Sequence, residues 1–209
     1  MKITAKHGRL NKIHISIDGE YLLTVDEIFW ADCGYISGDE IDSEELTAFR
    51  EAAGSRIAFN SALNSLDRRD HSVREIKQKL LQKYEQEYVD TAVDRLVELR
   101  LLDDGRFAAN YAHELYTYKK YGRNRIKSEL YRKGISSDII NDVLDEIFES
   151  EEADNVERIV DIIRKKYYNK MIDENSRRKV FSALMRLGYS FSDIKEAMSE
   201  FSDDEYYEE

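Results

Sequence analysis

The stretch that decides the fold is GRNRIKSELYRKG, residues 122–134. Its apolar residues Ile126 and Leu130 stand four positions apart, which places them on one face of an α-helix, and Gly134 suits the left-handed position that ends many helices. The same pattern recurs roughly 50 residues away on either side, as SVREIKQKL at residues 72–80 and SRRKVFSAL at residues 176–184. The sequence therefore predicts three helices of one kind and a repeating architecture.

A second apolar helix follows each copy after a short stop. The stops fall at Tyr84, Gly134 and Gly188, and Ser136 and Ser190 stand where the next helix needs an N-cap oxygen. With the helix that precedes each copy, we expect three-helix repeats at residues 56–103, 104–150 and 151–201. Such units bury their apolar faces by stacking, so we predict a mainly α, elongated tandem array of three repeats.

The expected helices can be given by residue range. They span residues 57–67, 72–83 and 87–100 in the first repeat, 104–119, 122–133 and 136–149 in the second, and 153–168, 175–187 and 190–200 in the third. Ser72 and Glu75 form a capping-box pattern at the start of the 72–83 helix. Ser176 is expected near the N-cap of the 175–187 helix.

A different pattern occupies residues 1–55. KIHISI at residues 12–17 and EYLLTV at residues 20–25 are rich in β-formers and flank Asp18-Gly19, a dipeptide that favours a two-residue hairpin turn with positive φ. The segment before them is predicted to add a third strand. Helices should follow, with N-caps at Asp26 and at Asp42 or Ser43. Because a lone hairpin is unstable in water, we expect this extension to pack on the first repeat.

The composition restricts the class of protein. The chain has 209 residues, of which 42% are hydrophobic and 36% charged, and it has no proline, which favours uninterrupted helices. No stretch approaches the roughly 18 apolar residues of a membrane span, and the N-terminus lacks a signal peptide, so we expect a cytoplasmic protein without membrane association. The single cysteine, Cys33, excludes an intramolecular disulfide and a multi-cysteine metal site.

Charge is unevenly distributed along the chain. The net charge is −11, yet residues 57–150 are nearly balanced and hold a basic stripe on and before the 122–133 helix, offset only by Glu129. The candidate residues for binding a partner or DNA are Lys119, Lys120, Arg123, Arg125, Lys127, Arg132 and Lys133, joined by Arg68, Arg69 and Arg74 of the first repeat. Such stripes bind phosphates mostly without sequence preference. The tail, residues 202–209, is acidic and is expected to fray.

Aromatic residues and a second basic cluster accompany this stripe. Tyr116, Tyr118 and Tyr121 interleave the basic run and could stack on bases, although such tyrosines more often pack with the ring inward. The second cluster consists of Arg164, Lys165, Lys166, Arg177, Arg178 and Lys179.

Catalysis finds little support in the sequence. The four histidines are scattered outside any metal-binding spacing, and neither GxxxxGKS nor GxGxxG occurs. Asp103-Asp104 is better explained as a helix start, where the dipole favours acids. We therefore predict that the protein is not an enzyme and that it holds no metal or organic cofactor.

Three blocks of the sequence resemble the RecX family of regulatory proteins. They are RDHSVREIKQKL at residues 69–80, LDDGRFA at residues 102–108, and GRNRI continuing to ELYRKGI within residues 122–135. The resemblance runs from about Ile57 to Phe201, and the N-terminal extension resembles that of longer members. Tyr84 departs from the glycine usual at that stop.

The resemblance implies a function as well as a fold. It implies a cytoplasmic modulator of the RecA recombinase that binds in the groove of the RecA filament on DNA and restrains ATP hydrolysis, strand exchange and filament growth, in recombination and DNA repair. On this interpretation we expect a monomer that binds DNA weakly and without sequence preference, mainly within the RecA complex.

Two other classes of protein remain open. One is a DNA-binding transcription regulator that uses the 122–133 helix as its recognition helix; such proteins usually dimerise and select an operator sequence. The other is a generic helical adaptor that binds proteins through a concave face, without nucleic acid.

Overall fold

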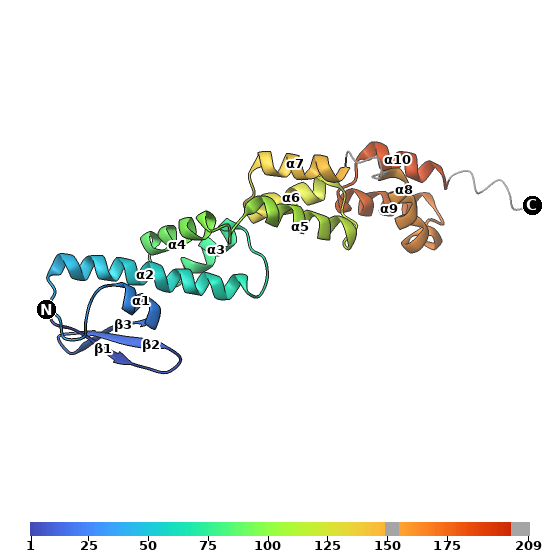
Figure 1. Ribbon diagram of the computed structural model, residues 1–209. Coiled ribbons are helices and arrows are strands. Elements are labelled where there is room, and N and C mark those ends of the chain that lie inside the picture. The colour runs from blue at the N-terminus through green and yellow to red at the C-terminus, as the bar shows by residue number, and fades with distance from the viewer. Residues whose placement is uncertain (149–154, 202–209) are drawn as a thin grey trace, which may run out of the picture. The chain divides into compact units, whose positions relative to one another are not determined.

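The computed structural model describes residues 1–148 and 155–201 (Figure 1). Within these residues the chain forms three strands and then ten α-helices, which confirms a mainly α fold with a small N-terminal β element. The chain divides into two compact units, one up to Asp103 and one from Asp104 onward. The predicted acidic tail, residues 202–209, lies outside the described residues.

The first unit begins with an antiparallel sheet in the order β1-β2-β3. The strands are β1 (Ile3–His7), β2 (Lys12–Ile17) and β3 (Glu20–Asp26). Asp18 and Gly19 have φ angles of 50° and 88°, which confirms the predicted tight turn between β2 and β3. One face of the sheet is apolar and buried; it presents Ile3, Ile13, Ile15 and Val25.

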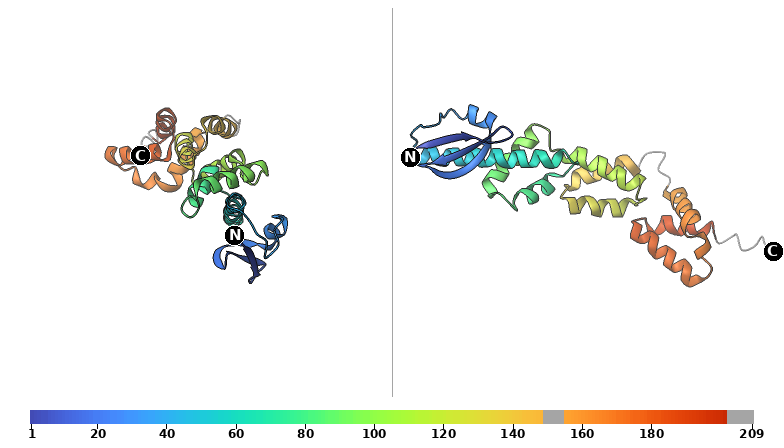
Figure 2. Two further views of the ribbon diagram at one scale, coloured as in Figure 1. Left: turned by 90° about the vertical axis from the view of Figure 1, so that its left-hand side faces the viewer. Right: turned by 90° about the horizontal axis from the view of Figure 1, so that it is seen from below.

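Two helices follow the sheet, and both are capped by aspartate as predicted. Asp26 caps α1 (Glu27–Asp32), and Asp42 forms a full capping box at the start of α2 (Ser43–Leu66). Phe49 and Ala53 of α2 are buried against the sheet, and Figure 2 shows the strands alongside this part of the helix.

Helix α2 also belongs to the first repeat. Its later residue Ala62 is buried in a second core together with Ile76 and Leu96. The helix runs without interruption for 24 residues, so the division expected between residues 55 and 56 falls inside one helix. A single rigid element therefore joins the sheet to the first repeat.

The rest of the first repeat consists of α3 (Val73–Leu80) and α4 (Gln86–Glu98). The predicted capping box is confirmed: Ser72 Oγ accepts from the Glu75 amide, and the Glu75 carboxylate accepts from the Ser72 amide. Helix α3 ends at Leu80, earlier than the predicted residue 83, and Leu81 takes the C-cap position.

The second unit contains the other two repeats. Their helices are α5 (Asp104–Thr117), α6 (Arg123–Lys133) and α7 (Ser137–Phe148), then α8 (Asn155–Lys166), the short 3-10 turn η1 (Tyr168–Lys170), α9 (Glu174–Leu187) and α10 (Phe191–Ser199). Each repeat has its own core, around Ile126 and Leu130 in one and around Val180 and Leu184 in the other.

The ends of these helices agree with most of the local predictions. Gly134 and Gly188 have φ angles of 84° and 93°, which confirms the left-handed C-caps, and Ser190 caps α10. The N-cap expected near Ser176 is wrong, because Asp173 caps α9 by accepting from the Ser176 amide at 2.6 Å.

Candidate nucleic-acid interface

Helix α6 begins where the second and third repeats meet. Its N-cap, Gly122, offers no side chain, and no side-chain hydrogen bond caps the helix. Instead the amides of Gly122 and Asn124 donate to the carbonyl oxygens of Leu187 and Gly188, at 2.8 and 3.1 Å. A helix C-terminus leaves carbonyls unpaired and an N-terminus leaves amides unpaired, so the end of α9 caps the start of α6.

This contact requires glycine on both sides. A Cβ on Gly122 would lie 2.6 Å from the Gly188 carbonyl oxygen, and one on Gly188 would clash with the backbone nitrogen of Arg125. In both cases the obstacle is backbone, which cannot rotate away. The two repeats therefore meet through main-chain atoms.

Arg158 of α8 adds side-chain contacts to this junction. Its guanidinium carbon lies 3.7 Å from the centre of the Tyr116 ring, and its Nη2 donates to the Tyr116 carbonyl. Its Nε donates to the Tyr189 hydroxyl at 3.2 Å, and that hydroxyl donates to the Lys120 carbonyl at 2.9 Å. Tyr189 is 2% exposed, and its burial raises the pKa of the hydroxyl although Arg158 opposes this. The α5–α6 loop is thus fixed to the third repeat.

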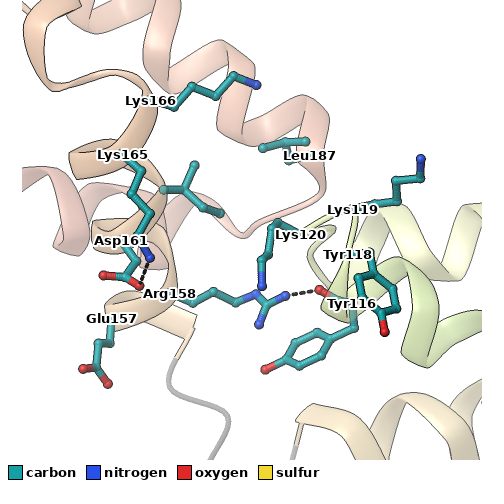
Figure 3. Close-up of a pocket in the computed structure, with 11 residues that line it drawn as sticks. Tyr116, Tyr118, Lys119, Lys120, Glu157, Arg158, Asp161, Lys165, Lys166 and Leu187 are labelled. Atoms are coloured by element: carbon teal, nitrogen blue, oxygen red, sulfur yellow. Dashed lines mark hydrogen bonds and ion pairs between the residues drawn. The ribbon is translucent and has the colours of Figure 1, made fainter.

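A pocket of about 540 Å³ lies beside this junction (Figure 3). It is formed by the end of α5, the α5–α6 loop, α8 and Leu187. Its charged lining residues are five cations, Lys119, Lys120, Arg158, Lys165 and Lys166, and two acids, Glu157 and Asp161. The pocket is therefore locally positive in a protein whose net charge is −11.

Asp161 of this lining forms an ion pair with a lysine. Lys165 Nζ lies 3.0 Å from the Asp161 carboxylate. This hydrogen bond and the charge of Lys165 lower the pKa of Asp161, and Arg164 and Lys120 lower it further. Asp161 is consequently ionised at neutral pH and offsets one lysine.

Two residues of the α5–α6 loop line the pocket in uncommon settings. Lys120 has a φ of +57°, a left-handed conformation that is uncommon outside glycine, and its side chain extends toward Arg158 (Figure 3). Tyr118 is 77% exposed, which is unusual for a side chain with so large an apolar ring. The loop therefore presents a cation and an aromatic ring together.

Three of the five cations of the predicted basic stripe on α6 form ion pairs. Arg123 pairs with Asp145 of α7, and Arg125 and Arg132 both pair with Glu129, which is only 4% exposed. The expectation that Glu129 alone offsets the stripe is therefore wrong, because helix packing brings Asp145 to Arg123. Arg123 thus links α6 to α7, whereas Arg125 and Arg132 pair within α6.

The remaining stripe residues differ in their surroundings. Lys133 lies with its Nζ 5.3 Å from the centre of the Tyr111 ring, and Lys127 is half-buried on α6. Lys119 and Lys120 are exposed and line the pocket. Of the predicted sites in the second unit, the structure brings only these two into the pocket.

The tyrosines of the basic run also divide into two kinds. Tyr116 carries Arg158 on its ring, and Arg125 lies 5.5 Å from the centre of the Tyr121 ring. Both therefore pack against protein, the commoner arrangement. Tyr118 remains as the exposed ring.

Arg68, Arg69 and Arg74 lie in the first unit, apart from these residues in the chain. Arg69 pairs with Glu75 at 3.1 Å and donates to the Asp70 carbonyl, so it supports the loop before α3. Arg68 and Arg74 are exposed.

Sequence reasoning missed the contribution of the third repeat. The sequence shows Lys165 and Lys166 as part of a basic cluster but does not predict that they face the α5–α6 loop. Arg158 belongs to none of the motifs or basic clusters found in the sequence. A signal existed for Tyr189, since the residue after a left-handed C-cap glycine often makes an apolar contact.

The described ranges, 1–148 and 155–201, contain no group of three His, Cys, Asp or Glu side chains placed to hold a metal ion. No helix among them is long and apolar enough to span a bilayer. The five cations that line the pocket favour an anion over a neutral ligand.

The fold and this site define a helical-repeat protein with a cationic, tyrosine-bearing pocket. Comparison with known families places it further. Family models described as the first and second three-helix domains of RecX match residues 58–96 and 103–144.

Individual relatives and structures agree with this match. A regulatory protein RecX of Haemophilus influenzae (strain PittEE) is 34% identical over 147 residues, covering 67% of this chain and 93% of the relative. One of Clostridium tetani is 28% identical over 203 residues, covering 95% and 92%. The crystal structure of RecX from Lactobacillus salivarius has a TM-score of 0.63 at 25% identity, covering 72% and 98% of the two chains. A crystal structure titled regulatory protein RecX has a TM-score of 0.73, which supports the fold. The chain belongs to the RecX family of regulatory proteins.

Proposed function

We propose that this protein regulates the RecA recombinase by binding, as a monomer, to the RecA filament on DNA, and that it has no catalytic activity of its own. Binding restrains RecA ATP hydrolysis, strand exchange and filament growth. The observation that carries the proposal is the match of two consecutive three-helix repeats to the corresponding RecX domains.

The charge distribution supports a composite target. A net charge of −11 opposes the coating of bare DNA, because a mostly acidic surface repels phosphates. The locally positive pocket and the exposed Arg68 and Arg74 can nevertheless contact phosphates at a few points. A nucleoprotein filament offers phosphates together with protein surface, so it suits such a molecule better than DNA alone.

A titration of the full chain into a RecA ATPase assay on single-stranded DNA tests the proposal. We expect the rate of ATP hydrolysis to fall as the protein approaches the concentration of RecA, with a matching loss of filament length by electron microscopy. Unchanged hydrolysis and unchanged filaments at a molar excess of the protein over RecA would refute the proposed function.

Paired charge reversals can then locate the contact. The double variant Arg68→Glu/Arg74→Glu removes two exposed cations from the first unit, and Lys127→Glu removes a half-buried cation from α6. Arg125 and Arg132 are unsuitable for reversal, because a glutamate there would face the buried carboxylate of Glu129. A higher concentration for half-maximal inhibition, with an unchanged melting temperature, identifies the unit that contacts the filament.

The geometry of α6 disfavours a transcription regulator. A recognition helix reads base edges with residues near its N-terminus. The N-terminus of α6 is occupied by the end of α9, and Arg123 and Arg125 are already paired with acids. Selective protection of one duplex sequence in a footprint would favour the regulator. An affinity for a protein partner that is unchanged when DNA is removed would favour a protein adaptor.

A further inference from the structure

We propose that the pocket between the α5–α6 loop and α8 binds one nucleotide of a single-stranded nucleic acid, with the phosphate between Lys120 and Arg158 and the base stacked on Tyr118. The inference rests on the proposed function for its biological meaning, since a RecA filament contains such a strand. It adds a specific site, formed jointly by the second and third repeats.

The size and charge of the pocket suit a nucleotide. Its volume of about 540 Å³ lies within the range of small-molecule sites. Five cations face two carboxylates, and Lys165 is already paired with one of these carboxylates. The excess of positive charge in a confined space favours an anion over a neutral ligand.

The phosphate position follows from Arg158 and Lys120. Tyr116 and Tyr189 fix the guanidinium through Nε, Nη2 and the ring contact, which leaves Nη1 to donate to a ligand. The Tyr189 hydroxyl also holds the Lys120 carbonyl, and Lys120 extends toward Arg158 from its left-handed backbone (Figure 3). Two cations held near each other repel, and an anion placed between them relieves that repulsion.

The left-handed backbone of Lys120 points to the same conclusion. A non-glycine residue keeps such a conformation only where its surroundings impose it, and such residues gather at ligand sites. Here the Tyr121 amide closes the end of α5 onto the Leu115 carbonyl, and the Tyr189 hydroxyl of the third repeat holds the Lys120 carbonyl. The cation is therefore preorganised before a ligand arrives.

The base position follows from Tyr118. Its ring lies at the pocket and is 77% exposed, whereas the Tyr116 ring is covered by Arg158. Aromatic rings beside a cationic groove bind single strands by stacking on bases, with little dependence on sequence. The bases of a duplex are stacked on each other and are not available to Tyr118. An acidic peptide would contact the lysines but would have no use for the tyrosine ring. The exposed ring therefore favours a single strand.

Fluorescence anisotropy with a labelled dT12 oligonucleotide at low salt tests the site. Tyr118→Ala should weaken affinity by roughly 5- to 100-fold, whereas Tyr118→Phe should stay within about twofold of wild type, because stacking does not need the hydroxyl. Lys120→Gln should weaken affinity and reduce the slope of log affinity against log salt by about 0.7, the value for one phosphate contact on a single strand. Lys195→Gln, which removes the same charge from an exposed position on α10 outside the pocket, is the matched control and should bind as wild type.

Competition experiments separate the possible occupants. Thymidine monophosphate should compete only at concentrations far above those of dT12. If it competes equally well per nucleotide, the site binds free nucleotides, and the proposal of a single-stranded ligand is wrong. Polyglutamate that competes as well as dT12, together with unchanged binding by Tyr118→Ala, would indicate an acidic protein segment and overturn the proposal. Wild-type affinity in both Tyr118→Ala and Lys120→Gln would do the same.

The two proposals fail separately. If dT12 binding depends on Tyr118 and Lys120 while RecA hydrolysis is unaffected by the protein, the pocket stands and the proposed function fails. If the protein inhibits RecA while substitution of Tyr118 and of Lys120 leaves dT12 affinity unchanged, the proposed function stands and this inference fails.

Discussion

Helices α3 and α6 occupy the same place in successive repeats, yet they begin in different ways. At α3 the Ser72 hydroxyl accepts from the Glu75 amide at 3.2 Å, and the Glu75 carboxylate accepts from the Ser72 amide at 3.4 Å. At α6 no side chain caps the helix, and the carbonyls of Leu187 and Gly188 take that role.

The difference shows how one local pattern serves two purposes. A capping box satisfies the first amides of a helix from within the chain segment itself, so α3 needs no neighbour at its start. A glycine N-cap leaves those amides available, and a second helix can then dock end to end. Because the start of α6 has no side-chain cap, the end of α9 can dock there, and the second and third repeats form one unit with a shared pocket.

The largest expected effect comes from breaking the end-to-end contact. Gly188→Ala adds a methyl group against the Arg125 backbone at a φ of +93°. Strain of the left-handed backbone and overpacking together should cost roughly 2 to 5 kcal/mol of unfolding free energy. Urea denaturation followed by circular dichroism should show an earlier transition, while the fluorescence of the single tryptophan, Trp30, should report an unchanged first unit.

A glycine in the hairpin provides the matched control. Gly19 has a φ of +88° with nothing within 4 Å of an added Cβ, so Gly19→Ala carries the backbone strain alone, about 1 to 2 kcal/mol. Equal losses in the two variants would mean that the contact with Arg125 contributes nothing.

The second largest effect is expected at a junction made by side chains, in contrast to the main-chain contact between α9 and α6. Asp26 caps α1 and accepts from Arg56 Nε and Asn60 of α2, at 2.9 and 2.8 Å. The hydrogen bond from Arg56, opposed by burial and helped by the Phe29 amide, holds the pKa of Asp26 well below its usual range. A lowered folded-state pKa stabilises the protein above the unfolded-state value of about 3.9, and this stability is lost as the pH falls toward the folded value.

Asp26→Asn should therefore cost the first unit about 1 to 2 kcal/mol at pH 7, allowing for screening by solvent, and much less at pH 2. Trp30 fluorescence during urea unfolding at several pH values measures the difference. The main-chain junction of α6 contains no titrating group, so the loss caused by Gly188→Ala should not vary with pH. A pH-independent difference between Asp26→Asn and wild type would contradict the assigned role of Asp26.

The smallest effect concerns the capping box itself. Ser72→Ala removes the hydroxyl that the Glu75 amide needs and should cost about 1 kcal/mol of unfolding free energy in the first unit. Ser72→Gly, which imitates the start of α6, should cost only a few tenths of a kcal/mol, the usual loss when glycine replaces serine at an N-cap. The urea midpoints of the two variants measure the difference. An alanine variant as stable as wild type would show that the capping box does not stabilise the first unit.

The sequence determined the local structure because helices, turns and caps depend on residues close together in the chain. Periodic apolar residues marked the helices, Ser72, Asp42 and Ser190 marked starts, and Asp18-Gly19 marked the hairpin. Gly54 lies inside α2, where an added Cβ would be 2.5 Å from the Tyr88 ring, so it permits α4 to pack closely. Only the packed structure shows why this position requires glycine.

The candidate site divides in the same way. The sequence supplied Lys119 and Lys120, since a basic run is visible along the chain, and it also supplied arginines that prove to be paired. The pocket itself needs Arg158, which contacts a residue 42 positions away, and Tyr189, which bonds one 69 positions away. No local pattern encodes such pairings. They arise when the cores of two repeats fix the end of α9 against the start of α6, and that docking alone decides which cations face one another.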